Sequence, residues 1–167
     1  DANAPLTLSS LRGRVVVLDF WTAGCINCLH LLGELRAAAR RLPRDVVFLG
    51  VHSGKFPAER RPERLAAACA RLGVAHPVAN DRQFRAWREW AVRGWPTLAV
   101  IDPRGYVAHQ QAGEARADAI VALVARVRDA AVTDGTLDPS PRWFDAAHDA
   151  MGHDAVGHDA AHGAAHG

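Results

Sequence analysis

The chain has 167 residues, of which 49% are hydrophobic, and it carries a net charge of +2. This size fits one globular domain with a core of ordinary volume. The sequence argues against a membrane span, because no apolar run approaches the roughly 18 residues required. It also argues against nucleic-acid binding, since no tight run of basic residues occurs. Three cysteines are too few, and odd in number, for a disulfide-stapled scaffold.

The first part of the chain alternates strands and a helix. Residues 15–20 form a continuous Val-rich run, typical of a strand buried on both faces. Apolar residues then recur at helical spacing over 25–41, and Pro43 ends that helix. Residues 45–51 are a second buried strand. Together these elements predict a βαβ unit with two parallel strands.

The second part predicts helices around a hairpin. Helices are expected over 57–72 and 81–91, followed by strands over 97–101 and 106–111 and a closing helix over 118–132. The two strands flank the turn Asp102-Pro103-Arg104-Gly105, in which Pro and Gly occupy the positions that a β-turn favours. The order of elements predicts an α/β fold.

Beyond residue 132 the composition changes. Residues 133–144 are rich in Pro, Gly and Asp and predict a linker after a domain of residues 1–132. Residues 145–167 are almost only Ala, Asp, Gly and His, so we expect a disordered tail. Its histidines could bind Zn²⁺, Ni²⁺ or Cu²⁺, or the repeats could be low-complexity drift without a function.

The chain begins at Asp1 rather than at Met. We therefore expect a processed, trimmed or partial product, in which any upstream targeting segment is not visible. The compartment stays unknown on this basis, with the cytoplasm slightly favoured.

Two cysteines stand two residues apart where the first strand gives way to the helix. Cys25 falls at the helix start, where free N–H groups and the helix dipole favour the thiolate that attacks a disulfide. Cys28 lies one turn further along and can resolve a mixed disulfide. Asp19 lies inside the apolar strand, and a buried carboxylate is costly. We expect Asp19 to accept the Cys28 proton, with satisfaction by backbone donors as the alternative.

Other interpretations of the cysteines remain open. The pair could be half of a zinc site, with His30 and His52 as the remaining ligands. It could also be passive core. Cys69, on the apolar face of its own predicted helix, is expected to be an inert buried cysteine.

Trp95-Pro96 immediately precedes the strand 97–101. Pro can open a strand although it cannot stand inside a central one. A cis bond here would bring the Trp95 backbone beside the two sulfurs, although trans is the commoner state. Free backbone groups at this point could then pair with an extended peptide. Trp21 and Trp95 are expected to flank the thiols, and the loop residues His52, Lys55 and Phe56 could border them.

Taken together, these features resemble the thioredoxin superfamily. The more specific resemblance is to the thioredoxin-like domain of NHL-repeat-containing proteins, and it extends from about Leu6 to Val132. The matching blocks are LDFWTAGCINCLH, GVHSGKFP, HPVAND and RGWPTLAVIDPRG. Two departures are Gly33, where the family usually has Pro, and Ile26-Asn27 in place of the Gly-Pro of thioredoxin.

The resemblance implies a thioredoxin-like three-layer fold, with a central mixed β-sheet flanked by helices. It places Asp19, Cys25, Cys28 and Pro96 on the family's buried acid, nucleophile, resolving cysteine and cis-proline. Substrate would contact Trp95, Pro96 and Trp21. The redox-active disulfide Cys25–Cys28 would be the working group, with no other cofactor and no metal.

The function indicated is a thiol–disulfide oxidoreductase in redox homeostasis. Its partners would be a disulfide-containing protein or small thiol substrate and an upstream reductase or oxidant, with the direction of electron flow left open. One alternative is a non-enzymatic interaction module that presents the Trp95–Pro96 face. A second is a peroxidase-type relative, although a peroxidatic site needs only one activated thiol.

Overall fold

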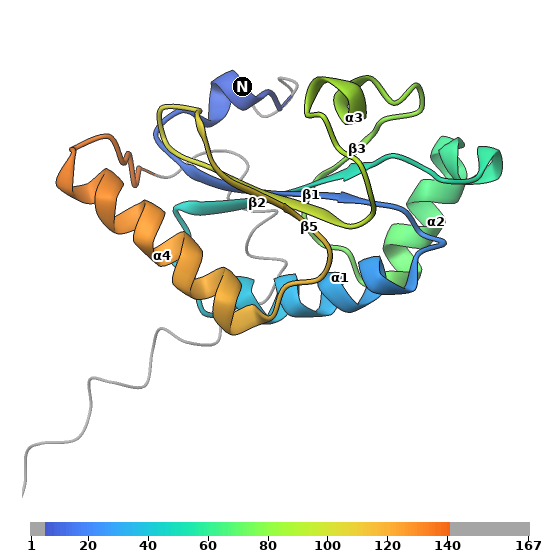
Figure 1. Ribbon diagram of the computed structural model, residues 1–167, viewed down its shortest axis with the longest axis horizontal. Coiled ribbons are helices and arrows are strands. Elements are labelled where there is room, and N and C mark those ends of the chain that lie inside the picture. Colours follow the sequence, from blue (N-terminus) through green and yellow to red (C-terminus); the bar gives the residue numbers. More distant parts are fainter. Residues whose placement is uncertain (1–5, 141–167) are drawn as a thin grey trace, which may run out of the picture.

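A five-stranded sheet organises the structure, a computed structural model that describes residues 6–140. The strand order is β3-β2-β1-β4-β5, where β1 pairs in parallel with β2 and antiparallel to β4. The strands are β1 (Val15–Trp21), β2 (Val46–His52), β3 (Val78–Asn80), β4 (Thr97–Ile101) and β5 (Val107–Ala112). Helices cover both faces (Figure 1), so the predicted three-layer fold with a mixed sheet is confirmed.

The central strand β1 explains the long apolar run in the sequence. All seven of its residues are buried, because β2 and β4 flank it and helices cover both of its faces. Successive side chains alternate between the faces. Val15 and Val17 face one hydrophobic cluster, whereas Val16, Leu18 and Phe20 face another.

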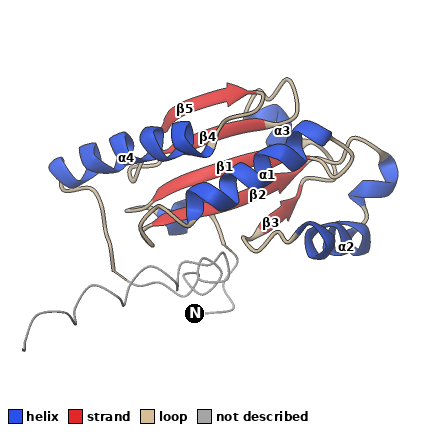
Figure 2. Ribbon diagram, turned by 90° about the horizontal axis from the view of Figure 1, so that it is seen from below, coloured by secondary structure: helices blue, strands red, loops and turns tan. Residues whose placement is uncertain are grey.

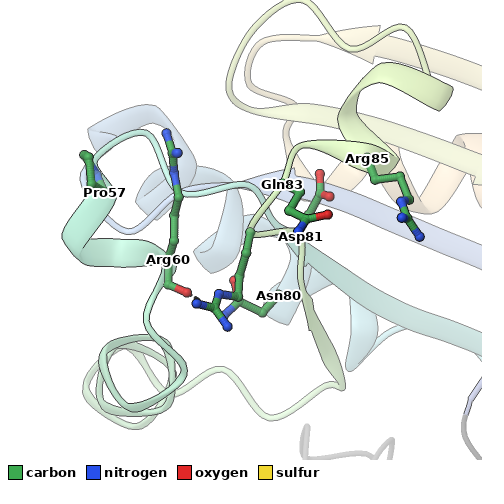
Figure 3. A pocket seen from close by; sticks show the side chains of 7 residues that line it. Pro57, Arg60, Asn80, Asp81, Gln83 and Arg85 are labelled. Atoms are coloured by element: carbon green, nitrogen blue, oxygen red, sulfur yellow. Dashed lines mark hydrogen bonds between the residues drawn. The ribbon is translucent and has the colours of Figure 1, made fainter.

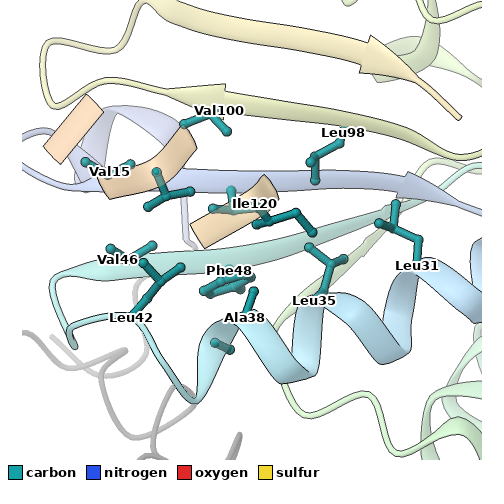
Figure 4. Close-up of a cluster of buried hydrophobic side chains, with 13 residues drawn as sticks. Val15, Leu31, Leu35, Ala38, Leu42, Val46, Phe48, Leu98, Val100 and Ile120 are labelled. Atoms are coloured by element: carbon teal, nitrogen blue, oxygen red, sulfur yellow. The ribbon is translucent and has the colours of Figure 1, made fainter. Parts of the chain in front are cut away.

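Two long helices cover the first face of the sheet. Helix α1 (Ile26–Ala39) and helix α4 (Ala117–Thr133) run across it side by side (Figure 2). Leu31 and Leu35 of α1 meet Ile120 of α4 and Phe48 of β2 in one cluster (Figure 4). Helix α2 (Pro62–Leu72) lies beside α1 and adds Leu65 to a smaller cluster that contains Cys28.

The opposite face is covered by shorter elements. The 3₁₀ helix η1 (Leu8–Leu11) and helix α3 (Arg85–Glu89) lie there (Figure 1). Leu11 packs in the second cluster, with Trp87 and Trp90 of the α3 region partly buried against it. Among the described helices, none is long and apolar enough to cross a bilayer.

Three elements differ from the sequence prediction. The helix expected over 57–72 is divided into η2 (Pro57–Arg60) and α2, because Arg61 is extended before Pro62. The helix expected over 81–91 is shortened to Arg85–Glu89, since Asp81 lies before it as a capping acceptor. The edge strand β3 was not predicted.

Part of the predicted linker packs on the domain. After α4 the chain turns at Gly135, and Leu137 then packs against the first cluster. The Asp138 N–H donates to the Gly13 carbonyl at 2.8 Å. The rest of the predicted linker and the whole predicted tail lie outside the described residues.

Candidate functional site

Cys25 occupies the junction between β1 and α1. The strand ends at Trp21, and Cys25 is the N-cap of α1, with extended backbone angles and no capping bond from its own side chain. Its N–H donates to the Thr22 carbonyl at 3.3 Å, which closes a short turn. The thiol is partly exposed, and the neighbouring Ile26 is 62% exposed. Cys25 is therefore the accessible thiol of the pair.

Cys28 lies one helical turn deeper. It is fully buried, and both thiols are free. Burial raises the pKa of the Cys28 thiol well above its ordinary value, and a hydrogen bond with Cys25 raises it further. Cys28 is therefore a protonated thiol at neutral pH.

Asp19 lies inside the sheet on the Cys28 side. It is 1% exposed, and neither carboxyl oxygen has a hydrogen-bond partner among the described residues. Burial raises the pKa of Asp19 from 3.8 to about 8. No backbone donor satisfies the group, so the alternative of a structurally satisfied Asp19 does not hold in this structure.

Trp95 and Pro96 complete the site on the side that faces Cys25. The peptide bond between them is cis, and the Trp95 carbonyl oxygen lies 3.9 Å from the Cys25 sulfur. Trp95 is partly exposed, whereas Pro96 is buried. The Trp95 indole N–H donates to the Ser53 carbonyl at 3.0 Å, which ties this side to the loop after β2.

The loop after β2 wraps around the turn that precedes Cys25. The Ala23 N–H donates to Nε2 of the buried His52 at 3.3 Å, and burial lowers the pKa of that imidazole. The Lys55 N–H donates to the Thr22 hydroxyl at 3.0 Å. A side chain on Gly24 would meet the Phe56 ring at 3.2 Å. All three loop residues singled out in the sequence therefore border the site.

Trp21 differs from its predicted role. Its side chain is fully buried in the cluster of Cys28 and Leu32, and its ring meets His52 edge-on at 4.8 Å. The reason is that Trp21 is the last residue of the central strand β1 and lies on the face that α1 covers. Trp21 therefore packs beneath the dithiol turn, and its side chain has no exposed surface for the substrate contact predicted from the sequence.

The sequence missed two further groups at the site. The Thr22 hydroxyl donates to the Glu59 carboxylate, and Glu59 also lies directly over Gly24. Asp81 accepts from the Ser53 hydroxyl at 2.9 Å, so it holds the loop that carries the Trp95 contact. No periodicity marks these residues, because their partners are distant in the sequence.

The two histidines of the zinc alternative do not join the cysteines. His30 contacts Glu114 at 3.2 Å, and His52 accepts from Ala23. Within residues 6–140, no group of three or more His, Cys, Asp or Glu side chains is arranged to hold a metal.

A mixed sheet with two thiols at the start of α1, facing a cis X–Pro bond, defines a thioredoxin-like domain. The family model described as "Thioredoxin-like" matches residues 13–107, so the chain belongs to this family.

Similar proteins support the assignment. The chain is 44% identical over 115 residues to Protein SUPPRESSOR OF QUENCHING 1, chloroplastic, of Arabidopsis thaliana, covering 67% of this chain and 11% of that protein. It is 40% identical over 121 residues to NHL repeat-containing protein 2 of Homo sapiens, covering 71% and 17%. The chain thus spans less than a fifth of these relatives.

Shorter relatives match over most of their length. Thiol:disulfide interchange protein DsbE of Allochromatium vinosum is 30% identical over 131 residues, covering 75% of this chain and 68% of that protein. The crystal structure of the thioredoxin-like superfamily protein SPOA0173 superposes with a TM-score of 0.66 at 28% identity, covering 75% and 86%. The predicted membership of the thioredoxin superfamily, with similarity to NHL-repeat-containing proteins, is confirmed.

Proposed function

We propose that the domain is a thiol–disulfide oxidoreductase in which Cys25 attacks and Cys28 resolves. The observation that carries this is the pairing of an accessible thiol at the start of α1 with a buried thiol one turn away. The helix start favours an anion at Cys25, and burial keeps Cys28 protonated until it is needed.

The exchange proceeds in two steps, attack by Cys25 and resolution by Cys28. The Cys25 thiolate attacks one sulfur of a substrate disulfide, that S–S bond breaks, and the leaving thiolate takes up a proton. Asp19 then accepts the proton of Cys28, whose thiolate attacks the Cys25 sulfur and releases the second substrate thiol. The substrate gains two electrons and the protein is left with a Cys25–Cys28 disulfide. A dithiol reductant would restore it, and the reverse sequence would oxidise a substrate.

Relatives named for this activity support the proposal. One matched protein is named a thiol:disulfide interchange protein and another a thiol-disulfide oxidoreductase. By this analogy the substrates are disulfide-containing proteins or small disulfides, and no cofactor is needed beyond the two cysteines. The Trp95 backbone, beside the Cys25 sulfur, would pair with the substrate chain.

The test is trapping with single-cysteine variants. The Cys28→Ser variant should accumulate a mixed disulfide at Cys25 with a disulfide substrate, Cys25→Ser should not, and Cys69→Ser is the matched control. Wild-type protein in glutathione buffers should form a reversible Cys25–Cys28 disulfide. Absence of both the mixed and the internal disulfide, by mass spectrometry after alkylation, would overturn the proposal.

An interaction module is the second candidate. Ile26, between the two cysteines, is 62% exposed, and Phe56, whose ring lies by Gly24, is 52% exposed, which suits an apolar partner. Partner capture that survives Cys25→Ser with Cys28→Ser, without any redox turnover of the wild type, would favour this function.

A further inference from the structure

A pocket lies at the ends of β2 and β3, beside the dithiol site. Its volume is about 660 Å³ (Figure 3). Its lining comes from η2, from the end of β3 and from the start of the α3 region: Pro57, Arg60, Asn80, Asp81, Arg82, Gln83 and Arg85. Three of the seven side chains are arginines.

The single carboxylate in this lining is already engaged within the domain. Asp81 is 8% exposed and accepts three hydrogen bonds, from the Ser53 hydroxyl and from the N–H groups of Ala86 and Trp87. Arg82 and Arg85 are exposed, and neither forms an ion pair with a carboxylate in residues 6–140. The pocket therefore presents positive charge outward while its negative charge is turned inward.

A row of contacts connects this pocket to the reactive thiol. The Arg60 guanidinium lies 4.8 Å from the centre of the Phe84 ring. The Phe84 ring meets Trp95 edge-on at 6.3 Å. The Trp95 carbonyl lies 3.9 Å from the Cys25 sulfur. A chain lying along Trp95 from Cys25 thus reaches Arg60, and with it the pocket that Arg82 and Arg85 also line.

We infer that the domain prefers disulfides in extended peptide segments that carry acidic residues near the cysteine; this rests on the proposed thiol–disulfide exchange. The guanidinium group matches a carboxylate in charge and in its paired N–H donors. Each extended residue covers about 3.3 Å, so the acidic positions lie roughly three to five residues from the cysteine.

The arrangement of the arginines suits several carboxylates better than one compact anion. Arg60 and Arg85 lie on opposite sides of the pocket, and their guanidinium groups point away from each other (Figure 3). A single phosphate would need them to converge. An extended acidic segment can meet them in turn.

The test compares two disulfide-bearing peptides that are identical except for three Glu residues, placed three to five positions from the cysteine, replaced by Gln. Reduced wild-type protein should react with the acidic peptide roughly five- to tenfold faster at low salt, and about equally fast at 0.5 M salt because exposed charges are then screened. Arg82→Gln with Arg85→Gln should remove the preference and leave the rate on the Gln peptide unchanged.

A variant of equal net charge is the control. Arg40→Gln with Arg126→Gln alters two exposed arginines that do not line this pocket, and it should keep the preference. Equal wild-type rates on both peptides, or a preference that survives Arg82→Gln with Arg85→Gln, would overturn the inference while leaving the exchange activity intact.

A binding measurement separates the two proposals. If neither peptide reacts, the exchange activity fails. The preference for acidic peptides is then judged with peptides in which Ser replaces Cys, using the tryptophan fluorescence of the protein, to which Trp87 and Trp95, with rings 4.4 Å apart, contribute. Tighter binding of the acidic form that is lost in Arg82→Gln with Arg85→Gln supports the inference, and equal or absent binding overturns it.

Discussion

The carboxyl group of Asp19 and the thiol of Cys28 share the buried layer between β1 and α1, and the charge of Asp19 disfavours the thiolate of Cys28. Neither carboxyl oxygen of Asp19 has a partner in the described part of the chain. Two negative charges in this buried layer are costly, so we expect only one of the two groups to be charged at a time. In the proposed exchange, Asp19 is the group that we expect to accept the proton in the resolving step.

The first prediction concerns the rate of that step. Since burial raises the pKa of Asp19 to about 8, its carboxylate becomes available as the pH rises through about 8. Release of substrate from the mixed disulfide should accelerate over this range in the wild type. Asp19→Asn should lower the rate at pH 8 by roughly 10- to 100-fold and remove this limb of the pH profile. Quenched-flow experiments with alkylation measure the rate of substrate release, and an unchanged pH profile would exclude Asp19 as the acceptor.

The second prediction concerns stability. The folded state keeps the Asp19 proton up to about pH 8, whereas the ordinary carboxyl releases it near 3.8. The folded state therefore holds more protons between these values, and the free energy of unfolding should fall as the pH rises through this window. Asp19→Asn should flatten that slope in urea denaturation. Asp118→Asn, at an exposed carboxylate, is the control.

The third prediction concerns His76, which is 7% exposed, with Nε2 unpartnered among the described residues. Burial, with a smaller contribution from Arg36, lowers the pKa of His76 from 6.5 to about 4. The unfolded chain then binds more protons between about pH 4 and 6.5, so stability should fall as the pH drops through that window. His76→Gln should reduce this slope.

The matched control for His76 is His30→Gln, at an exposed histidine. Both variants lose one histidine, and they differ in whether the histidine that is removed is buried. Unfolding would be followed in urea at pH values from 4.5 to 7.5. A slope reduced equally in both variants would contradict the assignment to His76.

Much of the fold could be predicted because strands that are buried on both faces appear in the sequence as continuous apolar runs. The apolar runs gave β1, β2 and β4, and the position of the cysteines after the first run placed them at the start of α1. Strand β3 left no such mark, because it has three residues at the sheet edge and its side chains are not buried. Local patterns also did not show that Arg61 would be extended and divide the helix.

The rest of the site depends on contacts between distant segments. Glu59 reaches Thr22 across 37 positions, and no spacing rule marks that pair. The basic pocket was hidden for another reason. Arginines are spread along the whole chain, so no single cluster stands out in the sequence, and only the fold brings Arg60 of η2 into one pocket with Arg82 and Arg85.

The fourth prediction compares two glycines that differ in the space around them. A Cβ on Gly50 would meet Trp21 Nε1 at 3.0 Å, Val78 Cγ2 at 3.1 Å and His76 Nε2 at 3.2 Å. Gly50→Ala should therefore cost about 1–3 kcal/mol by overpacking. A Cβ on Gly33, inside α1, would meet nothing within 4 Å, so Gly33→Ala should raise the free energy of unfolding by about 0.5–1 kcal/mol. Thermal and urea denaturation measure both, and equal effects would contradict this packing.

The last prediction concerns two ion pairs that differ in burial. Arg128 of α4 meets Asp45, just before β2, with Nε at 2.9 Å and Nη2 at 2.7 Å from its carboxylate oxygens, and the Asp45 side chain is 6% exposed. Arg41 meets Asp118 at 2.6 Å with both side chains exposed. Arg128→Ala leaves the buried Asp45 carboxylate without its two guanidinium donors, so it should lower the free energy of unfolding by about 2 kcal/mol.

Arg41→Ala should cost less than about 0.5 kcal/mol, because water replaces an exposed partner readily. The double variant Arg128→Met with Asp45→Leu removes the stranded charge and should recover much of the loss. If this double variant were as unstable as Arg128→Ala, the cost would come from lost packing of the Arg128 side chain on α4. Recovery would show that the stranded charge of Asp45, just before β2, accounts for the cost of Arg128→Ala.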